Sequence, residues 1–280
     1  MPPETSGAGI PPRQGEAMFV EQPPTRAGMK ATDRSRLASD PYRPGYHYLP
    51  PANWMNDPHG GIFWKGWYHL FYQHNPNGAF HGGRTGAIHW GHAVTEDFVH
   101  WQDLPIALAP TPDGPDRNNC ASGAAFINRE GVPTLIYHGV PDGICIATSH
   151  DDMLVNWEKH PANPVIPAPA PRGEYKVEGA CFAWIEGDTY YAITGNSSRE
   201  AFDGEEPDRA YLFRSKDLLH WEYMHPFYEG GRYTEGGGGL RRARLLPAGR
   251  QARAFLRQSH SGCAMLHRDL RGPPVHSRTA

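Results

Sequence analysis

The segment TEDFVHW at residues 95–101 occurs twice more in this chain, as SHDDMLVNW at residues 149–157 and as SKDLLHW at residues 215–221. Each copy begins with a hydroxyl residue, has an aspartate two positions later and ends on a tryptophan. The three tryptophans are 56 and 64 residues apart. A period of this length is typical of a repeated β-sheet unit.

A hairpin signal precedes each copy of the repeat. Turns at Gly66, Gly131 and Gly187 separate short runs rich in β-branched and aromatic residues, which is the pattern of two strands joined by a tight turn. Each unit therefore reads as strand, turn, strand and aspartate–tryptophan element, as in a four-stranded propeller blade. The alternative is a generic β-sandwich in which the spacing of the tryptophans is a coincidence.

The composition also favours a β protein rich in turns. The chain has 280 residues, of which 39% are hydrophobic, with 32 glycines and 28 prolines. This length suits one large domain or two small ones. No apolar run approaches the roughly 18 residues of a membrane-spanning helix, so no membrane partner is expected. The 16 histidines are scattered, which favours structural or sugar-contacting roles over a metal site.

The N-terminal segment and the cysteines bear on where the protein is found. Residues 1–40 are rich in proline, glycine, threonine and arginine and lack the apolar core of a secretory signal. They are expected to form a disordered extension, or to result from a start codon assigned too early. The cysteines do not have metal-ligand spacing and are expected to be free thiols. A cytoplasmic protein is therefore predicted. The four cysteines are Cys120, Cys145, Cys181 and Cys263.

The stretch WMNDPHG at residues 54–60 is the strongest candidate for a chemical site. Asp57 lies in a turn between Asn56 and Pro58, and strand-like runs follow. Aromatic residues, amides and histidines surround it, a mixture that suits a sugar because rings cover C–H faces and polar tips bind hydroxyls. An exposed aspartate at the mouth of a β-sheet is suited to attack a sugar carbon. The alternative is that Asn-Asp-Pro only starts a loop.

Several sequence blocks, in order, resemble glycoside hydrolase family 32, the β-fructofuranosidases that include invertase, levanase and inulinase. They are YHYLPPANWMNDPHG (46–60), FYQHNP (71–76), HWGHA (89–93) and ASGA (121–124). The resemblance covers roughly residues 40 to 235, and His59 stands where the family usually has asparagine. It implies an all-β, five-bladed propeller that is incomplete here, with about three legible blades and without the β-sandwich that usually follows.

The resemblance also implies site residues, and it implies no metal or organic cofactor. Asp57 would be the nucleophile of a retaining mechanism. Gly179 and Ala180 appear where the family has the Asp-Pro of a third carboxylate block, so Glu178 is the adjacent acid that would replace it, provided that a bulge re-aims it. The expected substrate-binding residues are Asn56, Gln73, Trp54, Trp90, Ser122 and Glu178, and Phe80 or His81 lies near a position where the family often has a sugar-contacting tryptophan.

The C-terminal segment differs sharply in composition. Residues 236–280 hold nine arginines, no lysine and one acid, a formal charge of +8, whereas residues 1–235 carry −11. Codons allowed for residues 238–247 spell Glu-Asp-Cys and Asp-Phe-Phe-Pro in a shifted frame, which resembles the family block that holds the acid/base glutamate. We therefore predict a frameshift near Glu235 and a poorly ordered tail. We do not assign Glu235 the acid/base role. The alternative is that the arginines bind a nucleic acid. The segment does not have aromatic residues interleaved with its basic residues, so no nucleic-acid partner is expected.

The predicted organisation has three parts: a disordered extension at 1–40, a partial propeller glycosidase domain at 41–235 and the arginine-rich tail at 236–280. The predicted function is hydrolysis of β-fructofuranosyl bonds in a small carbohydrate, sucrose or a fructan, with the oligomeric state left open. The first alternative is an inactive or sugar-binding propeller fragment that lacks the acid/base glutamate. Another is a different furanosidase specificity, such as arabinosidase, on the same fold.

Overall fold

The structure, a computed structural model, consists of β-strands and the loops between them. The described residues are 37, 39–45, 47–82, 86–169, 173–177, 179–195, 209–229, 240–248, 251–258 and 262–268. They form sixteen strands in four antiparallel sheets, which confirms the expected all-β class. Over these ranges, no helix has the length and apolar character needed to cross a membrane.

The first sheet pairs its strands in chain order. It contains β1 (Trp54–Trp64), β2 (Trp67–Asn75), β3 (His89–Thr95) and β4 (Trp101–Leu108). Gly66, in the predicted turn between β1 and β2, has a φ of 94°, a conformation that glycine adopts at little cost. The hairpin signal in the sequence therefore corresponds to a real tight turn.

The second sheet contains β5 (Asn119–Ile127), β6 (Pro133–Val140), β7 (Gly143–Thr148), β8 (Glu158–Lys159) and β9 (Ile166–Pro167). β5, β6 and β7 pair in chain order, and the two-residue strands β8 and β9 both pair with β7. The long strands β6 and β7 are almost continuously buried, as expected for strands that are covered on both faces.

The third sheet repeats the plan of the first. It contains β10 (Phe182–Glu186), β11 (Thr189–Gly195), β12 (Arg209–Ser215) and β13 (Trp221–Glu229), paired in that order. The β10–β11 turn again contains a glycine with positive φ, Gly187 at 62°. The three units predicted from the repeat are thus three separate sheets.

The fourth sheet lies in the arginine-rich segment, for which the composition predicts poor order. It contains β14 (Leu240–Ala248), β15 (Gln251–Gln258) and β16 (Gly262–Arg268), and β14 packs against the third sheet. Arginines alternate with apolar residues along parts of β14 and β15, and alternation with a period of two favours a strand. The reading frame of this segment stays a prediction.

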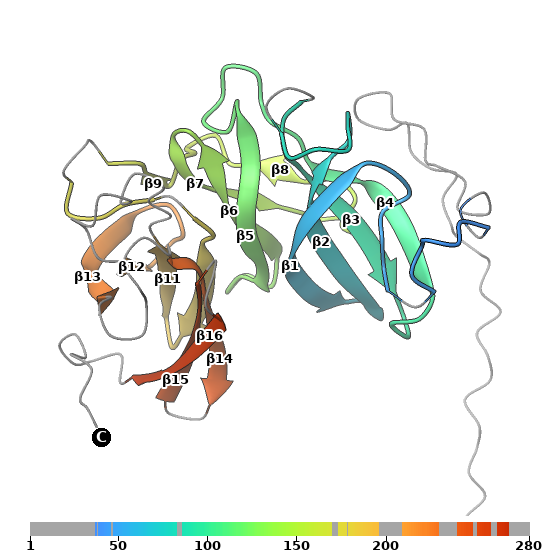
Figure 1. Ribbon diagram of the computed structural model, residues 1–280. Coiled ribbons are helices and arrows are strands. Elements are labelled where there is room, and N and C mark those ends of the chain that lie inside the picture. The colour runs from blue at the N-terminus through green and yellow to red at the C-terminus, as the bar shows by residue number, and fades with distance from the viewer. Residues whose placement is uncertain are drawn as a thin grey trace, which may run out of the picture.

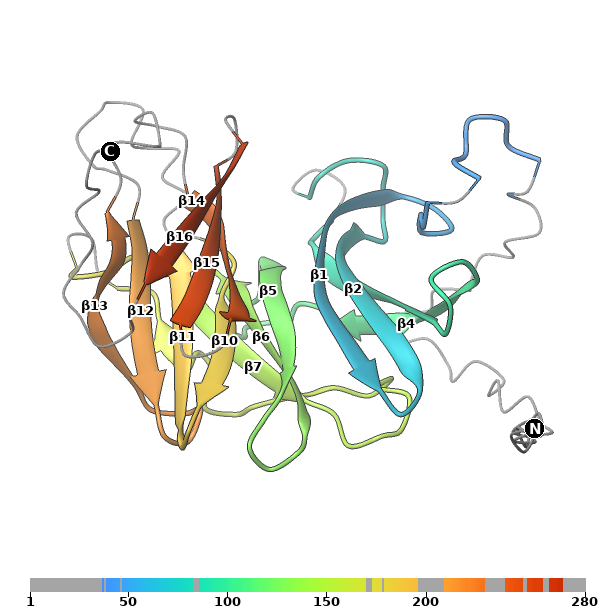
Figure 2. The same cartoon turned by 90° about the horizontal axis from the view of Figure 1, so that it is seen from below.

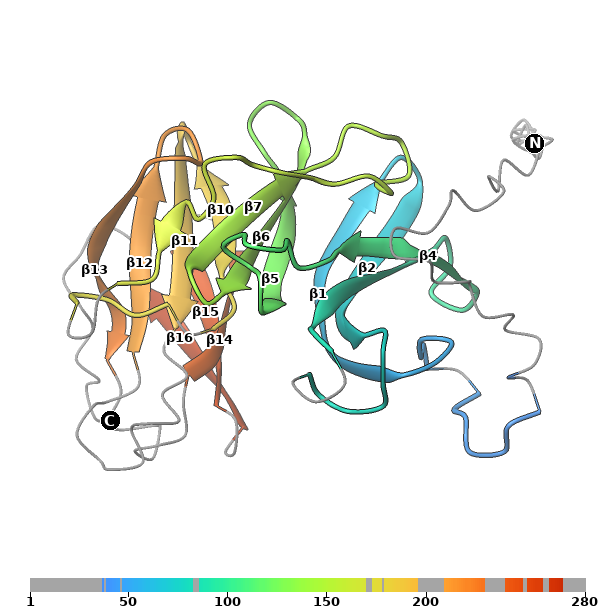
Figure 3. The same cartoon turned by 90° about the horizontal axis from the view of Figure 1, so that it is seen from above.

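The four sheets follow one another in an open arc (Figure 1). Strand β1 lies beside β5, and β5 lies beside β10, so the first strands of neighbouring sheets are adjacent. Views from below and above show the first sheet at one end of the arc and the third and fourth at the other (Figures 2 and 3). The described residues do not close the arc into a ring.

The repeated aspartate holds the corner before the fourth strand of each of the first three sheets. Asp97 accepts hydrogen bonds of 2.8 and 2.7 Å from the backbone amides two and three positions later, and Asp217 accepts equivalent bonds of 2.9 and 2.8 Å. In the longer second copy, Asp151 accepts from three amides. An aspartate that satisfies its own turn explains why the repeat is legible in the sequence.

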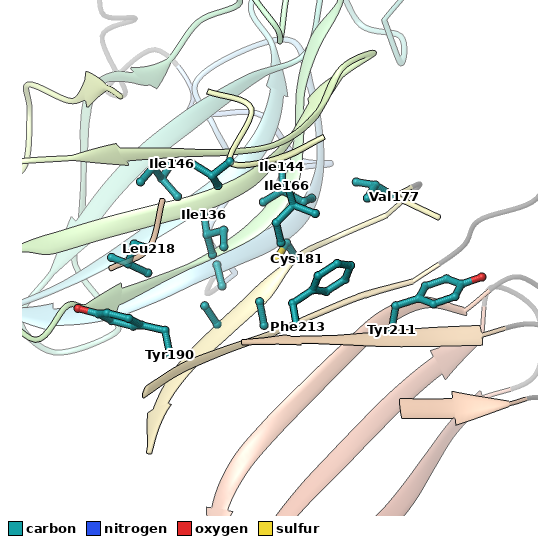
Figure 4. Packing of buried hydrophobic residues seen from close by; sticks show 14 residues of the cluster. Ile136, Ile144, Ile146, Ile166, Val177, Cys181, Tyr190, Tyr211, Phe213 and Leu218 are labelled. Atoms are coloured by element: carbon teal, nitrogen blue, oxygen red, sulfur yellow. The ribbon is translucent and has the colours of Figure 1, made fainter. Parts of the chain in front are cut away.

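Two apolar cores hold the first three sheets together. The core between the second and third sheets includes Ile136, Ile144 and Phe213, each at most 1% exposed (Figure 4). The core between the first and second sheets includes Phe71 and Trp90, both fully buried. Burial of each such side chain is worth roughly 1.5–3 kcal/mol, so these contacts fix which strands lie side by side.

Candidate active site

Asp57 is presented by a β-bulge near the start of β1. The pairing of β1 with β2 shifts between Met55 and Pro58, so that Asn56 and Asp57 together oppose Gln73 alone. A bulge of this kind re-aims a side chain away from the ordinary alternation of a strand. Asp57 remains partly exposed and Asn56 is exposed, as a residue that meets a substrate must be.

Two hydrogen bonds in series link Asp57, through Ser122 of the neighbouring sheet, to Gln73 of its own sheet. The Ser122 hydroxyl donates to Asp57 Oδ2 at 2.7 Å, and Gln73 Nε2 donates to Ser122 Oγ at 2.7 Å. Because a hydroxyl has one proton, the bond from Gln73 leaves that proton directed at the carboxylate. A bond to an ionised acceptor is stronger than a neutral one. Three of the predicted site residues are therefore brought together, from β1, β2 and β5.

Ser122 is itself presented by a second bulge. The pairing of β5 with β6 shifts between Cys120 and Gly123, so that Ala121 and Ser122 share one position opposite β6. A Cβ on Gly123 would lie 2.0 Å from the carbonyl oxygen of Ile136, far inside van der Waals contact. Only glycine lets the two strands approach this closely. Two bulges on adjacent first strands thus aim Asp57 and Ser122 at each other.

Trp54 is tied to the loop that follows β2. Its backbone N–H donates to the Gly78 carbonyl at 2.9 Å, and its carbonyl lies 3.0 Å from His74 Nδ1. Its ring meets His81 edge-on, with ring centroids 4.9 Å apart. Of the two residues expected near the family's tryptophan position, His81 therefore contacts Trp54, whereas Phe80 is 71% exposed.

Trp90 is expected in the wall of a sugar site, but its side chain is completely buried. The indole Nε1–H donates to the Ala121 carbonyl at 2.8 Å, and the ring lies 3.9 Å from that of His59, centroid to centroid. The reason is the position of Trp90 opposite Gln73 in the β2–β3 ladder, on the face that packs against the second sheet. Trp90 therefore contacts the backbone next to Ser122 and does not reach the surface.

A buried acid that no sequence motif marks anchors the approach to β5. Asp116 is 0% exposed, accepts from the Tyr137 hydroxyl at 2.8 Å and the Cys120 thiol at 3.3 Å, and pairs with Lys159. Burial acts to raise the pKa of Asp116, but the hydrogen bonds and the charge of Lys159 outweigh it and the pKa is lowered. Burial raises the pKa of the Cys120 thiol well above its ordinary range, so Cys120 is not a nucleophile.

Two buried histidines contact each other inside the first sheet. His69 Nδ1 lies 2.9 Å from His92 Nε2, and the side chains are 2% and 0% exposed. Burial lowers the pKa of His69 from 6.5 to about 4, and burial together with His69 holds the pKa of His92 well below its ordinary value. Both rings are therefore neutral near pH 7, and the pair belongs to the packing of the sheet.

The structure does not locate a second carboxylate opposite Asp57. Glu178 and Glu235 both lie outside the described residues. Gly179 and Ala180, predicted from the family resemblance to stand in place of an Asp-Pro pair, are partly exposed just before β10. Throughout the described part of the chain, no three histidines, cysteines or acids are grouped so as to hold a metal ion.

Residues 47–238 match the family described as Glycosyl hydrolases family 32 N-terminal domain. The chain belongs to glycosyl hydrolase family 32. Sucrose-6-phosphate hydrolase of Zymomonas mobilis subsp. mobilis is 36% identical over 226 residues, which are 73% of this chain and 41% of that protein. Beta-fructofuranosidase, insoluble isoenzyme 6, of Oryza sativa subsp. japonica is 35% identical over 187 residues, 64% of this chain and 30% of that protein.

Solved structures of family 32 proteins share the fold. Fructan 1-exohydrolase IIa from Cichorium intybus superimposes with a TM-score of 0.67 at 29% identity, covering 82% of this chain and 44% of that one. The family and the propeller type expected from the sequence are thereby confirmed. The chain spans less than half the length of these relatives.

Proposed function

We propose that this chain carries the nucleophilic half of a retaining glycosidase site for β-fructofuranosyl bonds, as in sucrose or a fructan. The observation that carries the proposal is the hydrogen-bond series from Gln73 through Ser122 to Asp57. Family 32 membership supports it. The substrate class is supported by two similar structures, a Bombyx mori β-fructofuranosidase variant in complex with sucrose and a Cichorium intybus fructan 1-exohydrolase IIa variant in complex with 1-kestose.

The proposed reaction uses Asp57 as the attacking group. A carboxylate oxygen of Asp57 bonds to the anomeric carbon of the fructosyl unit as the bond from that carbon to the leaving oxygen breaks. The leaving oxygen takes up a proton from an acid/base carboxylate or, in its absence, from water. Water then cleaves the resulting fructosyl ester, so the sugar keeps its original configuration. Ser122 binds Oδ2 and so fixes the rotation of the carboxylate before the attack.

Polar and aromatic neighbours are proposed to hold the sugar. Asn56 is exposed directly beside Asp57, and its amide can both donate to and accept from a fructosyl hydroxyl. Trp54, with His81 against its edge, offers an aromatic surface for C–H faces. Glu178 remains the proposed source of the anion that the family's third carboxylate block supplies.

The direct test uses 4-nitrophenyl β-D-fructofuranoside as substrate. Nitrophenolate leaves without being protonated, so the first step does not depend on the acid/base carboxylate. The full chain is expected to release nitrophenolate and to form a fructosyl adduct on the peptide that contains Asp57, detected by mass spectrometry. Azide, a nucleophile that needs no general base, should accelerate loss of the adduct. Asp57→Asn should abolish release and adduct alike; unchanged release by that variant would remove Asp57 from this role.

A non-catalytic sugar-binding protein is the second candidate. It is favoured by the replacement of the family's Asp-Pro with Gly179 and Ala180, which changes one of the three carboxylate blocks. This function predicts that calorimetry detects binding of fructose or sucrose, while the activated substrate yields neither nitrophenolate nor adduct. Adduct formation on Asp57 would exclude it.

A further inference from the structure

Trp90 occupies a position from which it acts on the nucleophile without meeting the substrate. Its side chain is fully buried, so no sugar reaches it. Its indole Nε1–H nevertheless donates a hydrogen bond of 2.8 Å to the carbonyl oxygen of Ala121. The next residue, Ser122, donates a hydrogen bond to Asp57. One peptide unit therefore separates the Trp90 hydrogen bond from the group that holds the nucleophile.

The bond from Trp90 falls where β5 departs from regular pairing. Ala121 and Ser122 form the bulge between the paired residues Cys120 and Gly123. Residues in a bulge are locally withdrawn from the ladder, so a side-chain donor there decides how the bulge is oriented. A bulge that rotated about its strand axis would carry the Ser122 hydroxyl away from Asp57.

The indole is itself held on several sides. The His59 ring packs against it at 3.9 Å, and the rings of Phe71 and Tyr137 both lie 6.0 Å away. The Tyr137 hydroxyl donates to the buried Asp116 at 2.8 Å. Because His59 is two residues after Asp57 on β1, Trp90 bridges the strand of the nucleophile and the strand of Ser122.

We propose that Trp90 is a positioning residue for the nucleophile: its indole N–H fixes the β5 bulge, the bulge aims the Ser122 hydroxyl, and that hydroxyl orients the Asp57 carboxylate. This inference rests on the proposed function of Asp57. It assigns His59, whose ring lies 3.9 Å from that of Trp90, the task of holding the indole plane.

The kinetic test removes the N–H and keeps the ring. Trp90→Phe and replacement of Trp90 by β-(3-benzothienyl)alanine, in which sulfur replaces the indole N–H, are compared with Trp157→Phe. Trp157 is a buried tryptophan of the same core, 2% exposed, so it serves as a matched control. Rapid mixing with the 4-nitrophenyl substrate measures the burst, which is the nitrophenolate released in the first turnover. Both changes at position 90 should lower the rate of this burst about 10- to 100-fold, the loss of rate expected when the attacking carboxylate is misplaced by about 1 Å.

Three readouts separate positioning from a general loss of structure. The burst amplitude, which counts active molecules, should stay unchanged in the position-90 variants, and Trp157→Phe should keep the wild-type burst rate. Ser122→Ala should slow the burst, and adding the position-90 change to it should cost nothing more, because both act through one bond. Additive losses, a fall in amplitude alone, or an equal slowing by Trp157→Phe would overturn the proposal.

A structural readout keeps this inference separate from the proposed function. If the wild-type chain forms no adduct, the proposed function fails, but crystal structures of the wild type and the two position-90 variants still decide the role of the N–H. We expect the separation of Ser122 Oγ and Asp57 Oδ2 to grow beyond about 3.5 Å, outside hydrogen-bond range. An unchanged separation of 2.7 Å would overturn the inference whatever the activity.

Discussion

Acidification should destabilise the first sheet through His69. Burial lowers the pKa of this residue from 6.5 to about 4. As the pH falls below 6.5, His69 of the unfolded chain is therefore protonated, whereas His69 of the folded chain stays neutral until about pH 4. The contribution of a neutral His69 is therefore complete above pH 6.5 and is lost as the pH falls toward 4. A gap of about 2.5 units corresponds to about 3 kcal/mol in full, and to about 2 kcal/mol at pH 5.

Urea unfolding followed by tryptophan fluorescence at pH 7, 6, 5 and 4 measures this loss. His69→Asn removes the titrating group and keeps a polar side chain beside His92. The variant should be less stable than the wild type at pH 7. Between pH 7 and pH 5, however, its free energy of unfolding should fall by about 2 kcal/mol less than that of the wild type.

A buried histidine outside this pair, His138, does not confuse the comparison. Burial also lowers the pKa of His138 to about 4, but this residue is present in both proteins and its contribution cancels. Ile136→Val, in the core between the second and third sheets, is the control, because it should cost about 1 kcal/mol at every pH. If His69→Asn lost stability with pH as steeply as the wild type, proton uptake by His69 would not be the cause.

Three substitutions test the supports of the site and the corners. Gly123→Ala should lower the free energy of unfolding by about 3 kcal/mol in urea titrations, because its Cβ would lie 2.0 Å from the Ile136 carbonyl oxygen. Lys159→Met should cost about 3–5 kcal/mol in the same assay, since it leaves the buried Asp116 without its cation. Asp217→Ala removes two hydrogen bonds to backbone amides and should lower the calorimetric Tm by roughly 2–4 °C. Wild-type behaviour would contradict the reasoning in each case.

The turns of this fold can be predicted from the sequence because the residues that stabilise each turn lie within a few positions of it. The turn at Asp97 closes on amides only two and three residues away, and the Gly66 and Gly187 turns need only their own backbone freedom. Asp57 was identifiable for the same reason, since its strand-and-turn neighbourhood and its sequence block are contiguous. The repeat therefore predicts the number and build of the first three sheets.

Contacts between distant segments are not encoded in any short pattern. Trp90 and Ala121 are 31 residues apart, and only the packing of the first sheet on the second brings them together. The exposure of a side chain is equally hard to predict from the sequence. Trp90 is an aromatic residue near a sugar-binding motif, and the motif is the same whether its ring faces the substrate or the core. Gly123 is the one local clue, as a glycine directly after Ser122 indicates a close backbone approach.

The self-contained corners have a consequence for how such a chain can change. Asp97 and Asp217 close seven-residue segments, whereas Asp151 closes a nine-residue segment by accepting one further amide. The same device thus already accommodates an insertion without help from an adjoining sheet. The number of residues at these corners can therefore change without disturbing the adjoining sheets. A corner transferred to another protein should keep its conformation. The bulges at Asp57 and Ser122 differ, because each must place its side chain against the other strand.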